Sequence, residues 1–415
     1  MFLKSKVKSD PKFLSWLILV LGVCFIVRAG YITIQRKRLS ELVISDMRTY
    51  DLLARNLVEK GYYGISTPWS YRPPLYPFFI SLVYRVVGTN YPAARITQAA
   101  LAVLTCLVLF ALGRCISDLR VGLVAAFLFS IDFALIHTSG LLLSENLYIP
   151  LSLLLIYLLA KNFQRFSISV SCLTGFIGGL AALCRPIVLP FLILVGLIPI
   201  LLKFNPYLKR SFLPGNRLAD RWLMKWVIIL LTAGLTISPW TIRNYLLHRS
   251  FVPISTNGGV MLWMGLHHGA PGGYHFPKEN NPLYPIKDEV ERNRVGYREA
   301  VKFILRFPGE FLNLTGKKMV QFWGSYLSTK SGKEWLVFML LGAAGFIISL
   351  REWRKWLIIY IYVASFAGVH LLAHSGYRYR FSLHPLVELW AALFLIWLWD
   401  KGKSLPTSKK GQLRS

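Results

Sequence analysis

Charged residues are scarce in this sequence, and acidic ones are the scarcest. Only 16% of its 415 residues are charged and 54% are hydrophobic, whereas about 25% of residues are charged in a typical soluble protein. This composition excludes an ordinary soluble domain and indicates a polytopic membrane protein. Nineteen acidic side chains face 48 basic ones, so any carboxylate at membrane depth is informative.

Motifs for disulfides, metals and cofactors are also missing. The five cysteines lie in apolar runs or at their ends, without CxxC or Cys/His spacing: Cys24, Cys106, Cys115, Cys172 and Cys184. This spacing supports neither a disulfide framework nor a zinc site. His267, His268 and His275 fall in a glycine-rich loop with no carboxylate or cysteine at ligand spacing. We therefore expect no metal and no cofactor.

The chain has no internal repeat of the kind that many transporters show. Its formal net charge of +29 does not indicate a nucleic-acid partner. The basic residues collect between apolar runs, which is typical of cytoplasmic loops.

Apolar runs of spanning length predict ten transmembrane helices. They cover 14–34, 93–114, 121–139, 144–160, 168–184, 186–203, 222–240, 335–350, 356–374 and 381–399. The first follows a basic tail and has no small-residue cleavage site, so we expect an uncleaved span. With both termini in the cytoplasm, every short basic loop lies on the inner side, including Arg114, Arg120, Lys161, Arg165, Lys203, Arg210, Lys225, Arg351, Arg354 and Lys355.

This topology leaves two long outer regions, 35–92 and 241–334, within a single transmembrane domain, 1–415. In the first, SELVISDMRTYDLLARNLVEKG is amphipathic at helical spacing from Leu42 to Leu57 and ends at Gly61, which predicts a surface helix. The second predicts two surface helices broken at Pro308. LYPFFISLVYRVVG would reverse all later loops if it were a span, so we interpret it as interfacial or re-entrant. Arg36, Lys37 and Arg38 remain on the outer side in this topology, contrary to the rule that basic residues stay in the cytoplasm.

Three carboxylates fall inside or at the edge of predicted spans: Asp132, Glu145 and Glu388. Ionisable groups at such positions usually serve a site or a pathway. Glu145 begins the fourth span on the outer side, level with Asp46 of the first outer region, and two carboxylates at one cavity suit acid/base chemistry. The alternatives are that Ser144 and Glu145 only cap a helix, and that Asp46 lies on a solvated face.

Arginines gather at the outer ends of the predicted spans, where positive residues are normally under-represented. They are Arg28, Arg72, Arg95, Arg185, Arg243, Arg378 and Arg380. An anion explains the set, and guanidinium groups suit phosphate, particularly a lipid phosphate whose tail stays in the bilayer. Any single member could instead be snorkelling to the interface.

Several motifs occur in an order that resembles the GT-C type membrane glycosyltransferases. They are Asp46 with Tyr50 four residues later, Arg72-Pro-Pro-Leu-Tyr-Pro77, LLLSENLY, LAALCRPIVLP, ISPWTIRNYLLHRSFVPISTNGG and YRYRFSLHP. The specific resemblance is to the bacterial family 39 or ArnT-like enzymes, relatives of the protein O-mannosyltransferases. The first outer region differs from the ArnT subgroup by Met47, where a second acid often follows, and by Arg72, where lysine is common.

The resemblance implies an all-α GT-C fold in the bacterial inner membrane, with about ten spans and interfacial helices in both outer regions. It implies transfer of a sugar from a polyprenyl-monophosphate donor to an acceptor hydroxyl of a lipid, protein or polysaccharide, usually with inversion, at the periplasmic face. Asp46 would be the general base and Glu145 would orient hydroxyls. The donor phosphate would be bound by Arg72, with Arg185, Arg243, Arg378 and Tyr50 as further donor-binding candidates.

Three other readings stay open. Arginines in a membrane cavity also suit a transporter or lipid-sugar flippase. A non-catalytic scaffold would have no need of Asp46 and Glu145. A glycan ligase that uses a diphosphate-linked donor differs only in the chemistry of that donor.

Overall fold

The computed structural model describes residues 11–41, 46–164, 167–204, 217–324 and 328–404. Within them the regular structure is helical, apart from an isolated bridge between Gly64 and Pro68. This confirms the predicted all-α fold. Leu42, Arg165 and Arg210, which entered the sequence argument, lie outside the described residues.

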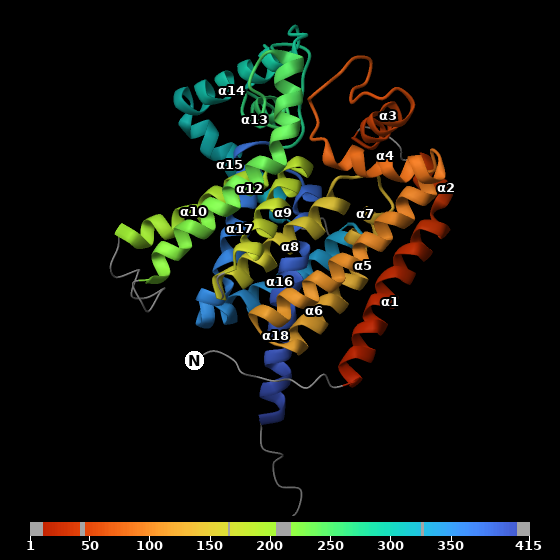
Figure 1. Cartoon of the computed structure of the whole chain (residues 1–415), viewed down its shortest axis with the longest axis vertical. Coiled ribbons are helices and arrows are strands. Elements are labelled where there is room, and N and C mark those ends of the chain that lie inside the picture. Colours follow the sequence, from red (N-terminus) through yellow and green to blue (C-terminus); the bar gives the residue numbers. More distant parts are fainter. Residues whose placement is uncertain (1–10, 42–45, 165–166, 205–216, 325–327, 405–415) are drawn as a thin grey trace, which may run out of the picture.

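The predicted spans all coincide with helices or helix pairs of one bundle (Figure 1). These are α1 (Pro11–Ile34), α5 (Tyr91–Ile116), α6 (Leu119–Ile131), α7 (Phe133–Ser139), α8 (Glu145–Gln164), α9 (Ile168–Cys184), α10 (Val188–Phe204), α12 (Arg217–His248), α16 (Lys330–Ser349), α17 (Trp353–Leu372) and α18 (His384–Ser404). By length and composition, five helical runs of the described chain could cross a membrane, or six if α6 and α7 form one span. The total of ten spans stays a prediction.

The predicted continuous span 121–139 is wrong in one respect, because it breaks at Asp132 with a bend of 60°. The Asp132 carboxylate accepts a hydrogen bond from the Leu135 amide at 3.0 Å and so caps α7. Arg28 of α1 donates to the carbonyls of Phe129 and Ser130, both at 3.0 Å, at the end of α6. Side chains therefore bind the free backbone groups on both sides of the break.

Shorter helices gather at one end of the bundle, where α3, α4, α13 and α14 lie together (Figure 1). The first outer region contains α2 (Arg36–Glu41), α3 (Asp46–Glu59) and α4 (Leu75–Val87), and the second contains α13 (Gly258–Gly265), α14 (Glu289–Arg306) and α15 (Pro308–Trp323). Two 3-10 helices, η1 (Leu350–Glu352) and η2 (Tyr377–Leu383), follow α16 and α17.

The amphipathic helix predicted before Gly61 and the two helices predicted on either side of Pro308 are present as α3, α14 and α15. Their place at the membrane surface stays a prediction. One face of α3 buries Met47, Tyr50, Leu53, Ala54 and Leu57, and the chain leaves it at Gly61 with φ of 73°. The break between α14 and α15 falls at Phe307 and Pro308. α4 has 13 residues, which is about 20 Å of helix and too short to cross a bilayer core of about 30 Å.

Close helix contacts fix the wall of the bundle beside the site. α9 packs on α12 through Gly175 and Gly179, and a Cβ atom added to Gly175 would lie 2.3 Å from the Ile229 carbonyl oxygen. Only glycine therefore permits this approach, as is common between membrane helices. The contact places the end of α9, and Arg185 after it, against the outer end of α12.

Candidate functional site

A cavity of about 660 Å³ lies at the end of the bundle where the shorter helices gather. Five of the predicted site residues line it: Asp46, Tyr50, Arg72, Arg185 and Arg378. They come from the first turn of α3, the segment before α4, the end of α9 and the 3-10 helix η2. Segments from both outer regions and from three bundle helices thus meet at one point.

Asp46 is held between two arginines. Its Oδ1 accepts from Arg72 Nη2 at 2.5 Å and its Oδ2 accepts from Arg378 Nη2 at 2.7 Å. Burial alone would raise the pKa of Asp46, but the guanidinium groups of Arg72 and Arg378 outweigh it and lower that pKa below its ordinary value. Asp46 is therefore a carboxylate at neutral pH, and both of its oxygens are engaged.

Glu145 lies behind the arginines rather than on the cavity surface. Its side chain is 1% exposed, and Oε1 lies 3.1 Å from Arg185 Nη1 and 3.3 Å from Arg378 Nε. The structure thus brings Glu145 to the predicted cluster but does not present it to a ligand. In this position it fixes the two guanidinium groups that do line the cavity.

Tyr50 links the two carboxylate positions. Its hydroxyl donates to Ser144 Oγ at 3.3 Å, and Ser144 Oγ donates to Glu145 Oε2 at 3.4 Å. Burial raises the pKa of Tyr50, so the phenol stays neutral and able to donate. The Arg72 guanidinium lies 5.8 Å from the centre of the Tyr50 ring, within cation–π range.

Arg243 is not brought to this cavity. Its Nη1 donates to the Trp69 carbonyl at 2.9 Å and to Ser70 Oγ at 2.7 Å, and its Nη2 donates to the Tyr63 carbonyl at 3.0 Å. These bonds clamp the segment that leads to Arg72. Arg243 therefore supports the site from outside it, which differs from its predicted role as a donor-binding residue.

A buried carboxylate joins the same segment to the second outer region. Glu289 Oε1 accepts from the Ser70 amide at 3.0 Å, and Oε2 accepts from Thr256 Oγ1 at 2.8 Å. His248 Nε2 lies 2.9 Å from Ser70 Oγ. These contacts form one network of Ser70, Arg243, His248, Thr256 and Glu289. It fixes the two outer regions to each other beside the cavity.

Sequence reasoning missed several cavity residues that come just before and after Arg378. His370, His374 and Tyr379 line the cavity, and His374 Nε2 lies 2.6 Å from the Tyr379 hydroxyl. His370 lies in the last turn of α17, and His374 lies two residues beyond the end of that helix. The remaining lining is largely apolar and includes Leu189, Pro190, Leu262 and Val369.

One of the arginines keeps a donor available. Arg72 Nε is buried and has no hydrogen-bond acceptor within the described chain, whereas Arg185 Nη1 is paired with Glu145 Oε1 at 3.1 Å. Buried N–H groups without acceptors are costly, so an anion in the cavity would satisfy this one. Three arginines and two carboxylates leave this cluster with one net positive charge, from +3 and −2.

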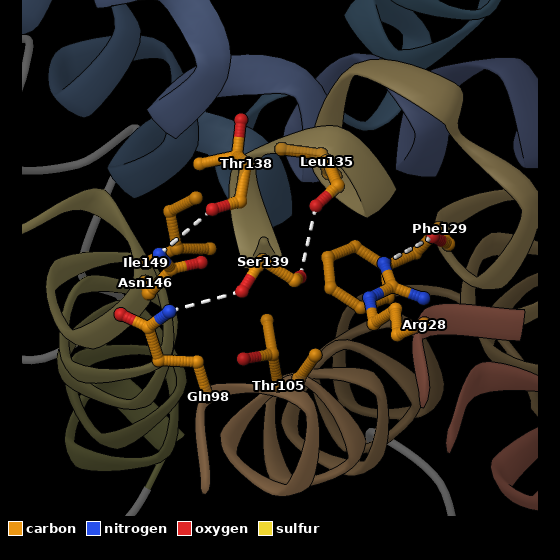
Figure 2. Close-up of a pocket in the computed structure, with 10 residues that line it drawn as sticks. Arg28, Gln98, Thr105, Phe129, Leu135, Thr138, Ser139, Asn146 and Ile149 are labelled. Atoms are coloured by element: carbon orange, nitrogen blue, oxygen red, sulfur yellow. Dashed lines mark hydrogen bonds between the residues drawn. The ribbon is translucent and has the colours of Figure 1, made fainter. Parts of the chain in front are cut away.

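Figure 2 shows a much smaller polar cavity, of about 20 Å³, in the bundle. There Gln98 Nε2 donates to the Ser139 carbonyl at 2.9 Å and Asn146 Nδ2 donates to the Thr138 carbonyl at 3.0 Å. The space is enough for about one water molecule and far too small for a sugar. Arg28 lies at its edge, bound to α6 carbonyls, so this arginine does not join the site.

Comparison with known proteins finds one similar family and several similar folds. Residues 71–240 match the sequence profile of the family described as dolichyl-phosphate-mannose-protein mannosyltransferase. No curated protein sequence matches the chain significantly.

Two solved structures share the fold. The archaeal oligosaccharyltransferase AglB from Archaeoglobus fulgidus, in complex with an inhibitory peptide and a dolichol-phosphate, aligns with a TM-score of 0.56 and 14% identity over 97% of this chain. ArnT from Cupriavidus metallidurans, bound to undecaprenyl phosphate, aligns with a TM-score of 0.54 and 13% identity over 95% of this chain. The chain spans 52% of the length of AglB and 62% of ArnT.

The profile match begins one residue before Arg72 and ends in α12, so it includes Arg72, Glu145 and Arg185. The structural matches extend over almost the whole chain. The chain is therefore similar to this family over residues 71–240 and shares its fold with AglB and ArnT.

Proposed function

We propose that the protein transfers a sugar from a polyprenyl-monophosphate carrier to an acceptor hydroxyl at the outer face of the bacterial inner membrane, with both termini in the cytoplasm. The observation that carries the proposal is the buried Arg72 Nε, a donor without an acceptor in the described chain, beside Arg185 and Arg378 in the lining of a partly apolar cavity. A lipid phosphate matches both halves of this cavity, since its headgroup needs donors and its tail needs apolar contacts.

The charge of the cluster favours a monophosphate-linked donor. A sugar phosphodiester carries one negative charge and neutralises the net charge of +1 left by Arg72, Arg185 and Arg378 with Asp46 and Glu145. A diphosphate-linked donor would bring a second negative charge with no matching cation among these residues. This argues against the glycan ligase.

In the proposed reaction, Asp46 accepts the proton of the acceptor hydroxyl as its oxygen attacks the anomeric carbon. The bond between that carbon and the phosphate oxygen breaks, and its electron pair leaves with the polyprenyl phosphate. A single displacement of this kind inverts the anomeric centre. The arginines stabilise the charge that develops on the leaving phosphate, and Glu145 positions Arg185 and Arg378.

Asp46 must leave its arginines to act as a base. The donor phosphate competes for Arg72 and Arg378 and so releases the carboxylate beside the reacting carbon. Loss of these partners raises the pKa of Asp46 toward the value a base needs. Donor binding would thereby activate the base, so that Asp46 acts as a base only when the donor is bound.

The flippase reading has less support. A flippase needs a path to both leaflets, whereas the cavity residues come from the ends of α9 and α17, the start of α10 and the two outer regions. Among the described residues, none from the opposite ends of these helices lines it.

The test uses purified protein in lipid with a panel of radiolabelled polyprenyl-phosphate sugars and an acceptor extract. We expect release of free polyprenyl phosphate with one donor, and loss of release in Asp46→Asn. Asp51→Asn, on the same helix but away from the cavity, is the matched control. Intact protein that releases polyprenyl phosphate from no donor would refute the proposal and favour the flippase.

A further inference from the structure

Three potential metal ligands converge inside the bundle, away from the cavity. Asp132, at the break between α6 and α7, meets His384 and Glu388 on α18, and each is 2% exposed or less. Asp132 Oδ2 lies 2.6 Å from His384 Nδ1. One ligand atom from each of the three residues lies within 4.8 Å of the other two. His384 and Glu388 are four residues apart and therefore share a helix face.

Among the described residues, no hydrogen bond offsets the cost of burying the Glu388 carboxylate. Neither of its carboxylate oxygens, nor Nε2 of His384, has a hydrogen-bond partner among the residues that the structure describes. Asp132 still has its capping bond from the Leu135 amide. A carboxylate at 0% exposure without donors is costly in an apolar interior, so Glu388 requires a cation or a proton.

The surrounding charges favour a cation. Glu334 of α16 accepts from the Phe133 amide at 3.0 and 3.1 Å, directly beside Asp132, and it interacts electrostatically with both Asp132 and Glu388. Arg28 also acts on Glu388 electrostatically, but its Nη atoms bind the Cys24, Phe129 and Ser130 carbonyls instead. Three carboxylates thus lie near one another without an arginine bound to them among the described residues.

Glu334 also supplies a route to the cluster. It is only half-buried, and its carboxylate lies one residue away from Asp132 across the Phe133 amide. A cation could therefore exchange through this carboxylate although the other three side chains are enclosed. An entry path is one of the features that a real metal site needs.

We propose that Asp132, His384 and Glu388 bind one divalent transition-metal ion of the zinc or manganese class. One imidazole nitrogen with two carboxylates suits these metals better than calcium or magnesium, which favour oxygen ligands alone. The ion joins the broken helix pair α6–α7 to the first turns of α18. Because η2 runs directly into α18, the ion also fixes the segment that carries Arg378. The site is structural and takes no part in the proposed transfer.

The experiment measures metal content in the purified, full-length protein by elemental mass spectrometry. The protein is stripped with EDTA, re-equilibrated with Zn²⁺ or Mn²⁺ and desalted. We expect about one equivalent in the wild type and less than about a tenth in Glu388→Gln and His384→Gln, as removing one of three ligands demands. His267→Gln is the control, because His267 Nε2 and His275 Nδ1 lie 2.9 Å apart and could collect metal adventitiously. This variant should retain the ion.

A second measurement does not depend on the folding of the variants. X-ray absorption of the metal-loaded wild type should show nitrogen and oxygen ligands with a single imidazole. Wild type that retains no metal would overturn the proposal and leave a proton shared between Asp132 and Glu388. Equal retention by folded Glu388→Gln, or a spectrum with two imidazoles, would place the ion elsewhere and overturn it too.

Discussion

Replacing Asp46 by asparagine should separate donor binding from turnover. The change keeps the size of the side chain but removes the negative charge that pairs with Arg72 Nη2 at 2.5 Å and Arg378 Nη2 at 2.7 Å. In the proposed mechanism this carboxylate is both the base and the competitor of the donor phosphate. We therefore expect opposite effects on rate and affinity.

The magnitudes follow from the charges. A general base contributes about 10²–10⁴ to the rate, so single-turnover transfer should fall by that factor. The cluster changes from +1 to +2 when one of its two carboxylates is lost. One extra unit charge about 4 Å from the phosphate adds up to about 4 kcal/mol at an effective dielectric of 20. Water in the open cavity reduces this, and we expect donor binding to tighten by at least about tenfold, or 1.4 kcal/mol.

The assay is equilibrium binding of the radiolabelled donor, followed by single-turnover transfer at saturating donor. Asp51→Asn is the control, since Asp51 binds Tyr84, Tyr91 and Arg55 on the outer side of α3 and should change neither quantity by more than about threefold. Turnover above a tenth of wild type would remove Asp46 as the base. Weaker donor binding in Asp46→Asn would refute the competition between carboxylate and phosphate.

Three further predictions test the surroundings of the site. Arg72→Ala should raise the apparent KM for the donor about 10- to 100-fold, as loss of a charged hydrogen bond of about 1.5–3 kcal/mol implies, with Arg72→Lys intermediate; an unchanged donor KM in steady-state assays would exclude Arg72 from the phosphate site. Arg243→Ala should lower the free energy of unfolding by about 2–6 kcal/mol, since it loses four hydrogen bonds of about 0.5–1.5 kcal/mol each; a donor KM raised as far as in Arg72→Ala would contradict this supporting role. Lys318 donates to the Leu372 carbonyl at 3.1 Å, and burial lowers its pKa to about 8 from 10.5. Between pH 8 and pH 10.5 the unfolded state therefore binds a proton that the folded state has lost. The free energy of unfolding consequently rises with pH in this range. Thermal unfolding from pH 7.5 to 10.5 should show this rise in wild type and not in Lys318→Met, and parallel curves would refute it.

The sequence predicted the helices well because hydrophobic run length and amphipathic spacing are local properties. It placed α3, the break at Pro308 and most of the residues that meet at the cavity. It could not distinguish Arg243 from Arg185, because both follow apolar runs near a proline. Their difference lies in what faces them: Arg243 meets the carbonyls of Tyr63 and Trp69, whereas Arg185 meets Glu145.

The break at Asp132 could not be predicted from the sequence, for a related reason. Apolar residues continue on both sides of it, so hydropathy alone indicates one uninterrupted span. The break depends on a cap from Asp132 and on Arg28, which reaches the Ser130 carbonyl from 102 residues away. Such long-range satisfaction of a helix end leaves no local pattern.

The pairing of Asp46 with Arg378 joins residues 332 positions apart. During synthesis, the helix that carries the aspartate enters the membrane long before the ribosome has made the second arginine. A nascent chain that can already receive the lipid therefore lacks a complete charge cluster, and it gains one only when α18 is inserted. Truncated chains that end before η2 would then lack the complete cluster and, under the proposed function, would be inactive.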